Sequence, residues 1–81
     1  MRVRLLAFAV AADRMGARET ALELEPGATV GDLRRAATAR WPALAPLAPG
    51  LAIAVDGALA SDSTRLADGA EIALLPPVSG G

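Results

Sequence analysis

The sequence contains no cysteine, histidine, tyrosine, lysine, asparagine or glutamine, and its only aromatic side chains are those of Phe8 and Trp41. Without a thiol there is no disulfide, no thiolate nucleophile and no soft metal site, and without an imidazole the commonest general base is missing. Asp, Glu, Ser, Thr and the chain termini are the reactive groups that remain. An enzyme that acts alone is therefore not expected.

Length and charge narrow the class of protein further. A chain of 81 residues builds one small core, and a net charge of -1 offers no attractive field to nucleic acid or to an anionic membrane. The longest uncharged stretch, residues 41–55, is interrupted by three prolines and is shorter than the roughly 20 residues of a membrane span. The run 2–12 resembles a signal peptide, but it is shorter than the usual roughly 15 to 30 residues and its loss would remove a predicted strand. We expect a soluble, cytoplasmic protein with neither nucleic acid nor membrane as a partner.

The first half of the chain predicts a hairpin followed by a helix. Residues 2–10 are typical of a buried strand, a short turn at 13–16 follows, and residues 19–25 alternate as a second strand with Leu22 and Leu24 on one face. Thr29 is a suitable helix N-cap, with the carboxylate of Asp32 in the first turn. The helix is expected over 30–41, where a buried stripe is formed by Val30, Leu33, Ala37 and Trp41.

The second half predicts three short strands around tight turns. Residues 42–50 are rich in proline and are expected to cross one end of the sheet irregularly. Strands are expected at 51–55, 58–60 and 71–75, with Asp-Gly turns at 56–57 and 68–69. A hairpin whose next connection carries one main helix across a mixed sheet of about five strands is an α+β arrangement called the β-grasp, or ubiquitin-like, fold.

The C-terminal segment Pro76-Pro77-Val78-Ser79-Gly80-Gly81 is the most informative part of the sequence. Two prolines end strand pairing and favour an extended exit, whereas two glycines fit a narrow channel and leave the terminal carboxylate unshielded. Fully extended, the six residues reach roughly 20 Å at about 3.3 to 3.6 Å each. We therefore expect a β-grasp domain over 1–75 and, over 76–81, an extended tail that inserts into a partner. A frayed chain end without function is the alternative.

The Gly81 carboxylate is the one group that such a tail presents to a reagent. A carboxylate resists nucleophiles until its oxygen becomes a better leaving group, and adenylation by ATP achieves this. The acyl adenylate then accepts an amine, which gives conjugation, or a sulfide, which gives a thiocarboxylate. The residues alone leave both outcomes open.

Three segments together resemble the MoaD/ThiS sulfur-carrier family, and within it the molybdopterin synthase small subunits. They are Phe8-Ala9 with the turn that closes at Gly16, the helix start at 29–33, and residues 66–73 with the tail 76–81. The similarity covers nearly the whole chain, and the last segment is the most specific. Two segments depart from the family pattern: residues 10–15, and the Ala- and Pro-rich loop 42–50.

The resemblance implies a mechanism and a set of partners. An E1-like, MoeB-like adenylating enzyme would activate Gly81 with ATP, and a sulfur-transfer protein would supply sulfide to form the thiocarboxylate. The tail would enter the large, MoaE-like catalytic subunit of molybdopterin synthase, in a heterotetramer, and donate sulfur to cyclic pyranopterin monophosphate. The chain itself would bind no cofactor and no metal, and would not be catalytic alone.

Other residues have structural interpretations that we favour over functional ones. Trp41 is expected to close the core, and the arginines at 34, 35 and 40 are expected to form a solvated helix face. The carboxylates of Asp56 and Asp68 are expected to accept hydrogen bonds from local backbone amides. Phe8 and Leu75 are the candidates for a docking surface, because a mean hydropathy of +0.39 suggests that a partner covers apolar surface.

Three classes of function remain open. The first is a sulfur carrier for molybdopterin synthase, with a ThiS-like carrier for thiamine or another pathway as its near neighbour. The second is a ubiquitin-like modifier conjugated through Gly81 to a lysine of a target. The third is an interaction module whose tail has no chemical role.

Overall fold

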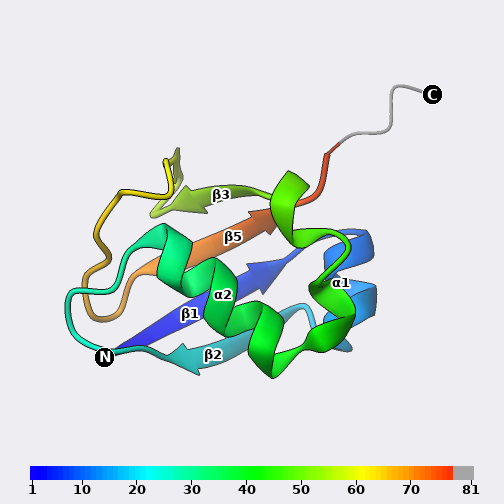
Figure 1. Ribbon diagram of the computed structural model, residues 1–81, viewed down its shortest axis with the longest axis horizontal. Coiled ribbons are helices and arrows are strands. Elements are labelled where there is room, and N and C mark those ends of the chain that lie inside the picture. The colour runs from blue at the N-terminus through cyan, green and yellow to red at the C-terminus, as the bar shows by residue number, and fades with distance from the viewer. Residues whose placement is uncertain (78–81) are drawn as a thin grey trace.

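The computed structural model describes residues 1–77, and over this range it contains one mixed five-stranded sheet in the order β2-β1-β5-β3-β4. Strands β1 and β5 pair in parallel at the centre of the sheet, and the other neighbours pair antiparallel (Figure 1). This is the predicted β-grasp arrangement. The strands are β1 (Arg2–Ala7), β2 (Glu19–Glu23), β3 (Ala52–Val55), β4 (Ala58–Leu59) and β5 (Glu71–Leu75).

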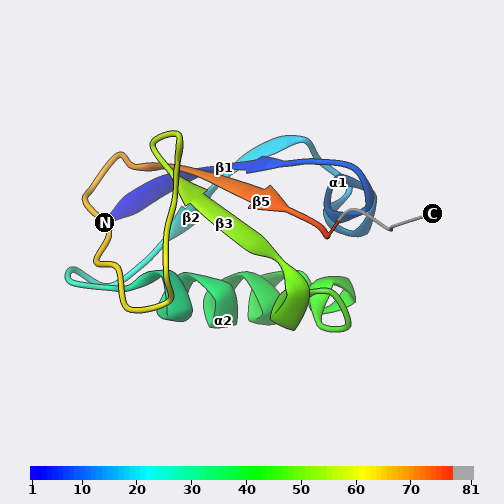
Figure 2. The same ribbon diagram turned by 90° about the horizontal axis from the view of Figure 1, so that it is seen from above.

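Helix α2 (Val30–Arg40) lies across one face of the sheet (Figure 2). Alternation in the strands turns every second side chain toward it, as the strong burial of Val3, Leu5, Ile72 and Leu74 shows. The predicted helix stripe is confirmed at Val30, Leu33 and Ala37. Trp41 lies one residue beyond the helix and is half-buried against the margin of the core, with the Arg40 guanidinium 5.1 Å from its ring centre. The fully buried large side chains are those of Val3, Leu5, Val30, Leu33, Leu44, Ile53, Ile72 and Leu74.

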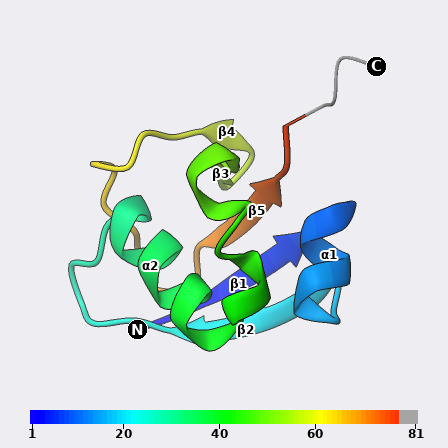
Figure 3. The same ribbon diagram turned by 45° about the vertical axis from the view of Figure 1, so that its right-hand side comes forward.

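The connection between β1 and β2 differs from the prediction. Strand β1 ends at Ala7 rather than at residue 10, and helix α1 (Val10–Met15) replaces the expected short turn. The segment is rich in alanine, a strong helix former, and Ala11 and Met15 lie four residues apart on the face that is buried. Gly16 ends the helix in the left-handed region at φ 72°. Figure 3 shows α1 beside the end of β1, close to the point at which β5 ends.

The loop over residues 42–50 is more regular than its prolines suggested. It forms two 3-10 turns, η1 (Pro42–Leu44) and η2 (Ala48–Gly50), each with a proline in its first two positions. Proline suits the start of such a turn because the amide hydrogen it lacks has no partner there in any case. Leu44 is buried, so η1 contributes to the core.

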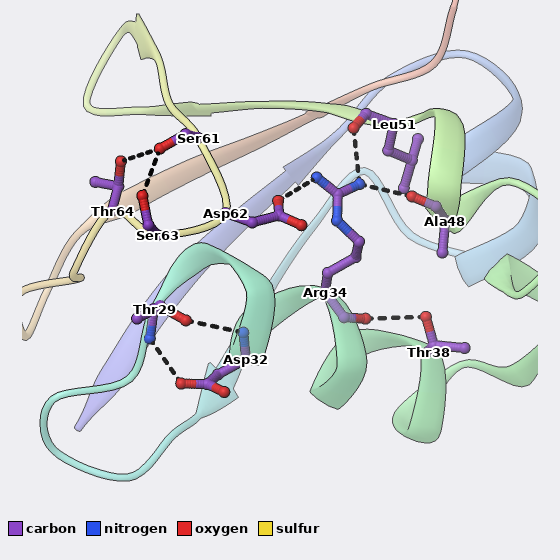
Figure 4. Close-up of polar contacts among 10 residues, drawn as sticks. All are labelled: Thr29, Asp32, Arg34, Thr38, Ala48, Leu51, Ser61, Asp62, Ser63 and Thr64. Atoms are coloured by element: carbon purple, nitrogen blue, oxygen red, sulfur yellow. Dashed lines mark hydrogen bonds and ion pairs between the residues drawn. The ribbon is translucent and has the colours of Figure 1, made fainter.

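The N-terminus of α2 is closed by a capping box, as the sequence predicted. The amide of Asp32 donates to the Thr29 hydroxyl over 3.2 Å, and the amide of Thr29 donates to the Asp32 carboxylate over 2.9 Å. The next two amides, of Val30 and Gly31, donate to the carbonyls of Thr64 and Asp62. The loop 61–65 is thereby fixed against the first turn of the helix (Figure 4).

Two predictions about carboxylates and one about arginine need correction. Asp56 and Asp68 do bind backbone amides, but distant ones: the amides of Glu71 and of Arg2 each donate to them over 2.9 Å, at the first residues of β5 and β1. The guanidinium of Arg34 is not solvated, since its side chain is only 20% exposed and its two terminal nitrogens make three hydrogen bonds. In contrast, Arg35 is 76% exposed, in agreement with the prediction.

Asp32 makes the stability of the domain sensitive to acid. Its pKa is lowered below the ordinary value of 3.8, first by the hydrogen bond from the Thr29 amide and then by the one from Arg35. A carboxyl whose pKa is lower in the folded state stabilises that state above its unfolded pKa, and this contribution is lost as the pH falls through the folded pKa. We expect Asp32→Asn to unfold at lower urea concentration than the wild type at neutral pH, and the gap between the two midpoints to close well below pH 3.8. A gap that stayed constant over this range would contradict the assignment.

Candidate functional site

The sheet face opposite α2 is divided into a charged half and an apolar half. At the N-terminal end of β1, Arg2 pairs with Glu23 over 2.8 Å, and Arg4 pairs with Glu19 and, over 3.4 Å, with Glu71. These five side chains are all at least 46% exposed, so they form a solvated ionic network.

The other half of this face carries no charged side chain on its central strands. The register places Leu6 beside Ala73, Ala73 beside Ala54, and Leu75 beside Ala52. Leu59 of β4 lies opposite Ala54 and is 75% exposed, and Phe8, just beyond β1, is 46% exposed. We call this surface the apolar patch, and it consists of Leu6, Phe8, Ala52, Leu59, Ala73 and Leu75.

The position of Phe8 follows from an unusual backbone conformation at the next residue. Ala9 has φ 51° and ψ −129°, a region that alanine rarely adopts and that turns the chain out of β1 and into α1. Phe8 lies directly before this turn and is 46% exposed. Residues in sparsely populated backbone regions cluster at active sites, ligand clamps and switch regions.

The start of the tail and the apolar patch share one end of the sheet. Leu75, the last residue of β5, belongs to the patch, and Pro76 and Pro77 follow it directly. A partner that covers the patch is therefore also next to the point at which the tail begins. The predicted docking residues Phe8 and Leu75 are brought to this common face, whereas the predicted tail residues Val78, Ser79, Gly80 and Gly81 lie outside the described residues.

Sequence reasoning did not single out Leu6, Ala52, Leu59 and Ala73 as part of this surface. A signal was present, because residues 2–10 carry apolar side chains on both faces while a single helix covers only one face of the sheet. Among residues 1–77, none of the acidic side chains gather into a group that could hold a metal ion. Over the same range, no helix has the length and apolar character needed to cross a membrane.

Taken together, the β-grasp fold, the apolar patch and the adjoining tail define a small ubiquitin-like carrier domain. A family model described as the ThiS family matches residues 5–81. The chain belongs to the ThiS family and is a sulfur-carrier protein of the MoaD/ThiS type.

Solved structures with the same fold include an archaeal modifier protein and molybdopterin-converting factor subunits. The chain is 30% identical to SAMP1 from Haloferax volcanii, covering 100% of both chains with a TM-score of 0.89. It is 28% identical to a protein from Pyrococcus furiosus provisionally assigned as molybdopterin converting factor, subunit 1, over 96% of this chain and 99% of that one, with a TM-score of 0.88. It is also 28% identical to a chain in the complex of subunits 1 and 2 of molybdopterin-converting factor from Helicobacter pylori, over 100% of both chains, with a TM-score of 0.70.

Proposed function

We propose that this protein carries sulfur as a thiocarboxylate on Gly81 and donates it within a cytoplasmic molybdopterin synthase. The observation that carries the proposal is the apolar patch at the end of the sheet from which the tail starts, in a chain of the ThiS family. The likeness to subunit 1 of the Helicobacter pylori complex supports the choice of pathway.

The chemistry at Gly81 takes two steps before sulfur is delivered. A carboxylate oxygen attacks the α-phosphorus of ATP on an E1-like, MoeB-like enzyme, and pyrophosphate leaves. Sulfide from a sulfur-transfer protein then attacks the acyl carbon, and AMP leaves with the oxygen, so that a thiocarboxylate remains. In the synthase its sulfur passes to cyclic pyranopterin monophosphate, and water restores the carboxylate. Two such donations build the dithiolene of molybdopterin.

In these reactions the domain provides a docking surface and no cysteine, histidine or lysine side chain that could react with the activated tail. The apolar patch resembles the core of a protein interface in composition, and the ion pairs of Arg2 and Arg4 form a polar margin on the same face. A MoaE-like large subunit that covers the patch would receive the tail in its active site. Since the sequence contains no cysteine, histidine or lysine, no side chain of these types on the carrier competes for the activated Gly81.

A second candidate is a ubiquitin-like protein modifier, which the likeness to SAMP1, the small archaeal modifier protein 1, favours. In that case the same acyl adenylate, or a thioester derived from it, would be attacked by the amine of a target lysine. Activation and docking would use the same tail and the same apolar patch. The two candidates therefore differ in the nucleophile that attacks the activated Gly81, which is sulfide for the carrier and a lysine amine for the modifier.

Intact-mass analysis of the protein isolated from its own cells separates these candidates. For the sulfur carrier, we expect a fraction of the chains to gain the mass that corresponds to replacing one carboxyl oxygen by sulfur. For the modifier, we expect covalent adducts between Gly81 and a lysine of another protein. Chains that are wholly unmodified in cells actively making molybdopterin would refute the proposed function.

A further inference from the structure

The Arg34 side chain joins three segments that are distant in the sequence. One terminal nitrogen, Nη1, donates to the carbonyl oxygens of Ala48 and Leu51 over 2.6 and 2.8 Å, and Nη2 donates to Oδ1 of Asp62 over 2.8 Å. Figure 4 shows the guanidinium between α2, the η2 turn and the loop 61–65. Bonds from an ionised donor are about twice as strong as those between neutral groups, and the planar fork fixes their directions.

Asp62 is itself fixed in place, which makes the arrangement stiff. The amide of Gly31 in the first turn of α2 donates to the Asp62 carbonyl over 2.9 Å. The carboxylate of Asp62 therefore meets Arg34 from a loop that is already fastened to the same helix. Arg34 therefore connects the η2 turn to α2 and to the loop 61–65, which are already joined to each other.

The two carbonyls that Arg34 binds lie on either side of Pro49 and Gly50. The turn also makes its own hydrogen bonds, from the Gly50 amide to Leu47 over 3.0 Å and from the Leu51 amide to Ala48 over 3.3 Å. Proline at position 49 fixes one more backbone angle. Gly50 thus sits in a turn whose position relative to α2 is set from both ends.

Gly50 faces the start of the tail. A β-carbon built on Gly50 would lie 3.7 Å from Cγ and 4.0 Å from Cδ of Pro77. The Pro77 ring therefore lies just beyond the space that a side chain at position 50 would occupy. Gly50 is not among the glycines with positive φ, so its backbone conformation does not require glycine. The absence of a side chain at position 50 instead leaves space beside Pro77.

We propose that the η2 turn, which Arg34 holds in place, limits the path of the tail where it leaves the sheet. Gly50 and Arg34 are then positioning residues for the chemistry at Gly81. Leu75 is the last tail-side residue paired in the sheet, with Ala52, and Pro76 and Pro77 have no amide hydrogen with which to continue pairing. The position of Pro77 beside Gly50 is a second point, beyond the sheet, at which the tail passes close to the domain. The sheet pairing of Leu75 and the position of Pro77 together set the path of residues 75–77. The effect on catalysis rests on the proposed function, but the placement of Pro77 beside Gly50 is a property of the free chain.

The first test changes the side chain at position 50. Gly50→Ala places one carbon at ordinary contact distance from Pro77 and should leave the tail in place. Gly50→Ile adds two branches at the β-carbon, which leaves few orientations that avoid the proline ring. In ATP–pyrophosphate exchange with the cognate adenylating enzyme, we expect kcat for Gly50→Ile to fall on the order of tenfold or more, because misplacement by about 1 Å can cost that much or more. KM should not change, since the apolar patch is intact, and Gly50→Ala should behave as the wild type.

The second test weakens the hydrogen bonds between Arg34 and the η2 turn. Arg34→Lys keeps the charge, but a single ammonium group does not reproduce the planar fork that joins two carbonyls and a carboxylate. We expect it to lower kcat in the same direction at unchanged KM, whereas Arg35→Lys, on the exposed neighbouring position, should have no effect. Thermal midpoints measured for each variant show which domains are folded at the assay temperature. Wild-type kcat for folded Gly50→Ile would overturn the inference.

A measurement on the free chain keeps this inference separate from the proposed function. In the wild type, nuclear Overhauser effects between the α-protons of Gly50 and the ring protons of Pro77 are expected, and they should persist in Arg35→Lys and weaken in Arg34→Lys. Their absence in the wild type would overturn the placement of Pro77 beside Gly50, whatever the enzyme assay shows. If they are present but the wild type is not adenylated, the proposed function fails and the placement of Pro77 stands.

Discussion

Removal of Gly81 is expected to abolish sulfur transfer while the folded domain keeps its stability. Deletion moves the carboxylate back by one residue, about 3.3 to 3.6 Å along an extended chain, which is several times the displacement that costs about a hundredfold in rate. The last fully buried side chain is that of Leu74, so nothing in the core depends on residue 81. Thiocarboxylate formation is measured by intact mass after incubation with ATP, the adenylating enzyme and a sulfide donor.

A length-preserving variant provides the control for this deletion. Gly81→Ala keeps the carboxylate at the same distance from the sheet and adds one methyl group, so part of the activity should survive. Circular dichroism and the thermal midpoint should be the same in wild type, deletion and substitution. Sulfur transfer by the deletion variant at the wild-type rate would show that the reactive group is elsewhere.

Placing a charge in the apolar patch is expected to weaken docking of the large subunit strongly. Ala73 lies at the centre of this patch, between Leu6 and Ala54, on the face that α2 does not cover. Ala73→Glu would bury a carboxylate with no partner in the interface, which typically costs 2 to 5 kcal/mol and weakens binding on the order of a hundredfold. Isothermal titration calorimetry with the large subunit measures this loss directly.

The charged half of the same face offers a matched control. Ala21 of β2 lies opposite Arg4, within the ionic network, and Ala21→Glu introduces the same side chain on the same face of the sheet. It should bind the large subunit within a fewfold of wild type. Equal losses for Ala21→Glu and Ala73→Glu would show that docking does not depend on the apolar half.

The elements that sequence reasoning predicted well are those with local signals. Thr29 and Asp32 form the capping box within four residues of chain, and Asp56-Gly57 forms a hairpin turn in which both residues have positive φ, 48° and 87°. In the predicted strand 71–75, alternation places Ile72 and Leu74 on one face, and that face is buried. In each case the residues that decide the structure are neighbours in the sequence.

The features that sequence reasoning missed depend on partners far along the chain. Arg34 binds carbonyls 14 and 17 residues away and a carboxylate 28 residues away, and no local pattern distinguishes it from the exposed Arg35. Asp68 accepts from an amide 66 residues away. Helix α1 was missed for a different reason, because an apolar run continuing from a strand fits either structure until its ends are known. The apolar patch became recognisable only once α2 was placed on one face of the sheet.

The central position of β5 links the folding of the domain to the presence of its later residues. Any product truncated before residue 71 lacks the strand that joins β1 to β3, so its sheet separates into two hairpins, and isolated hairpins are marginally stable at best. The apolar patch also needs β5, which supplies Ala73 and Leu75 between Leu6 and Ala52. Docking of a partner on the apolar patch therefore requires a chain that extends through β5.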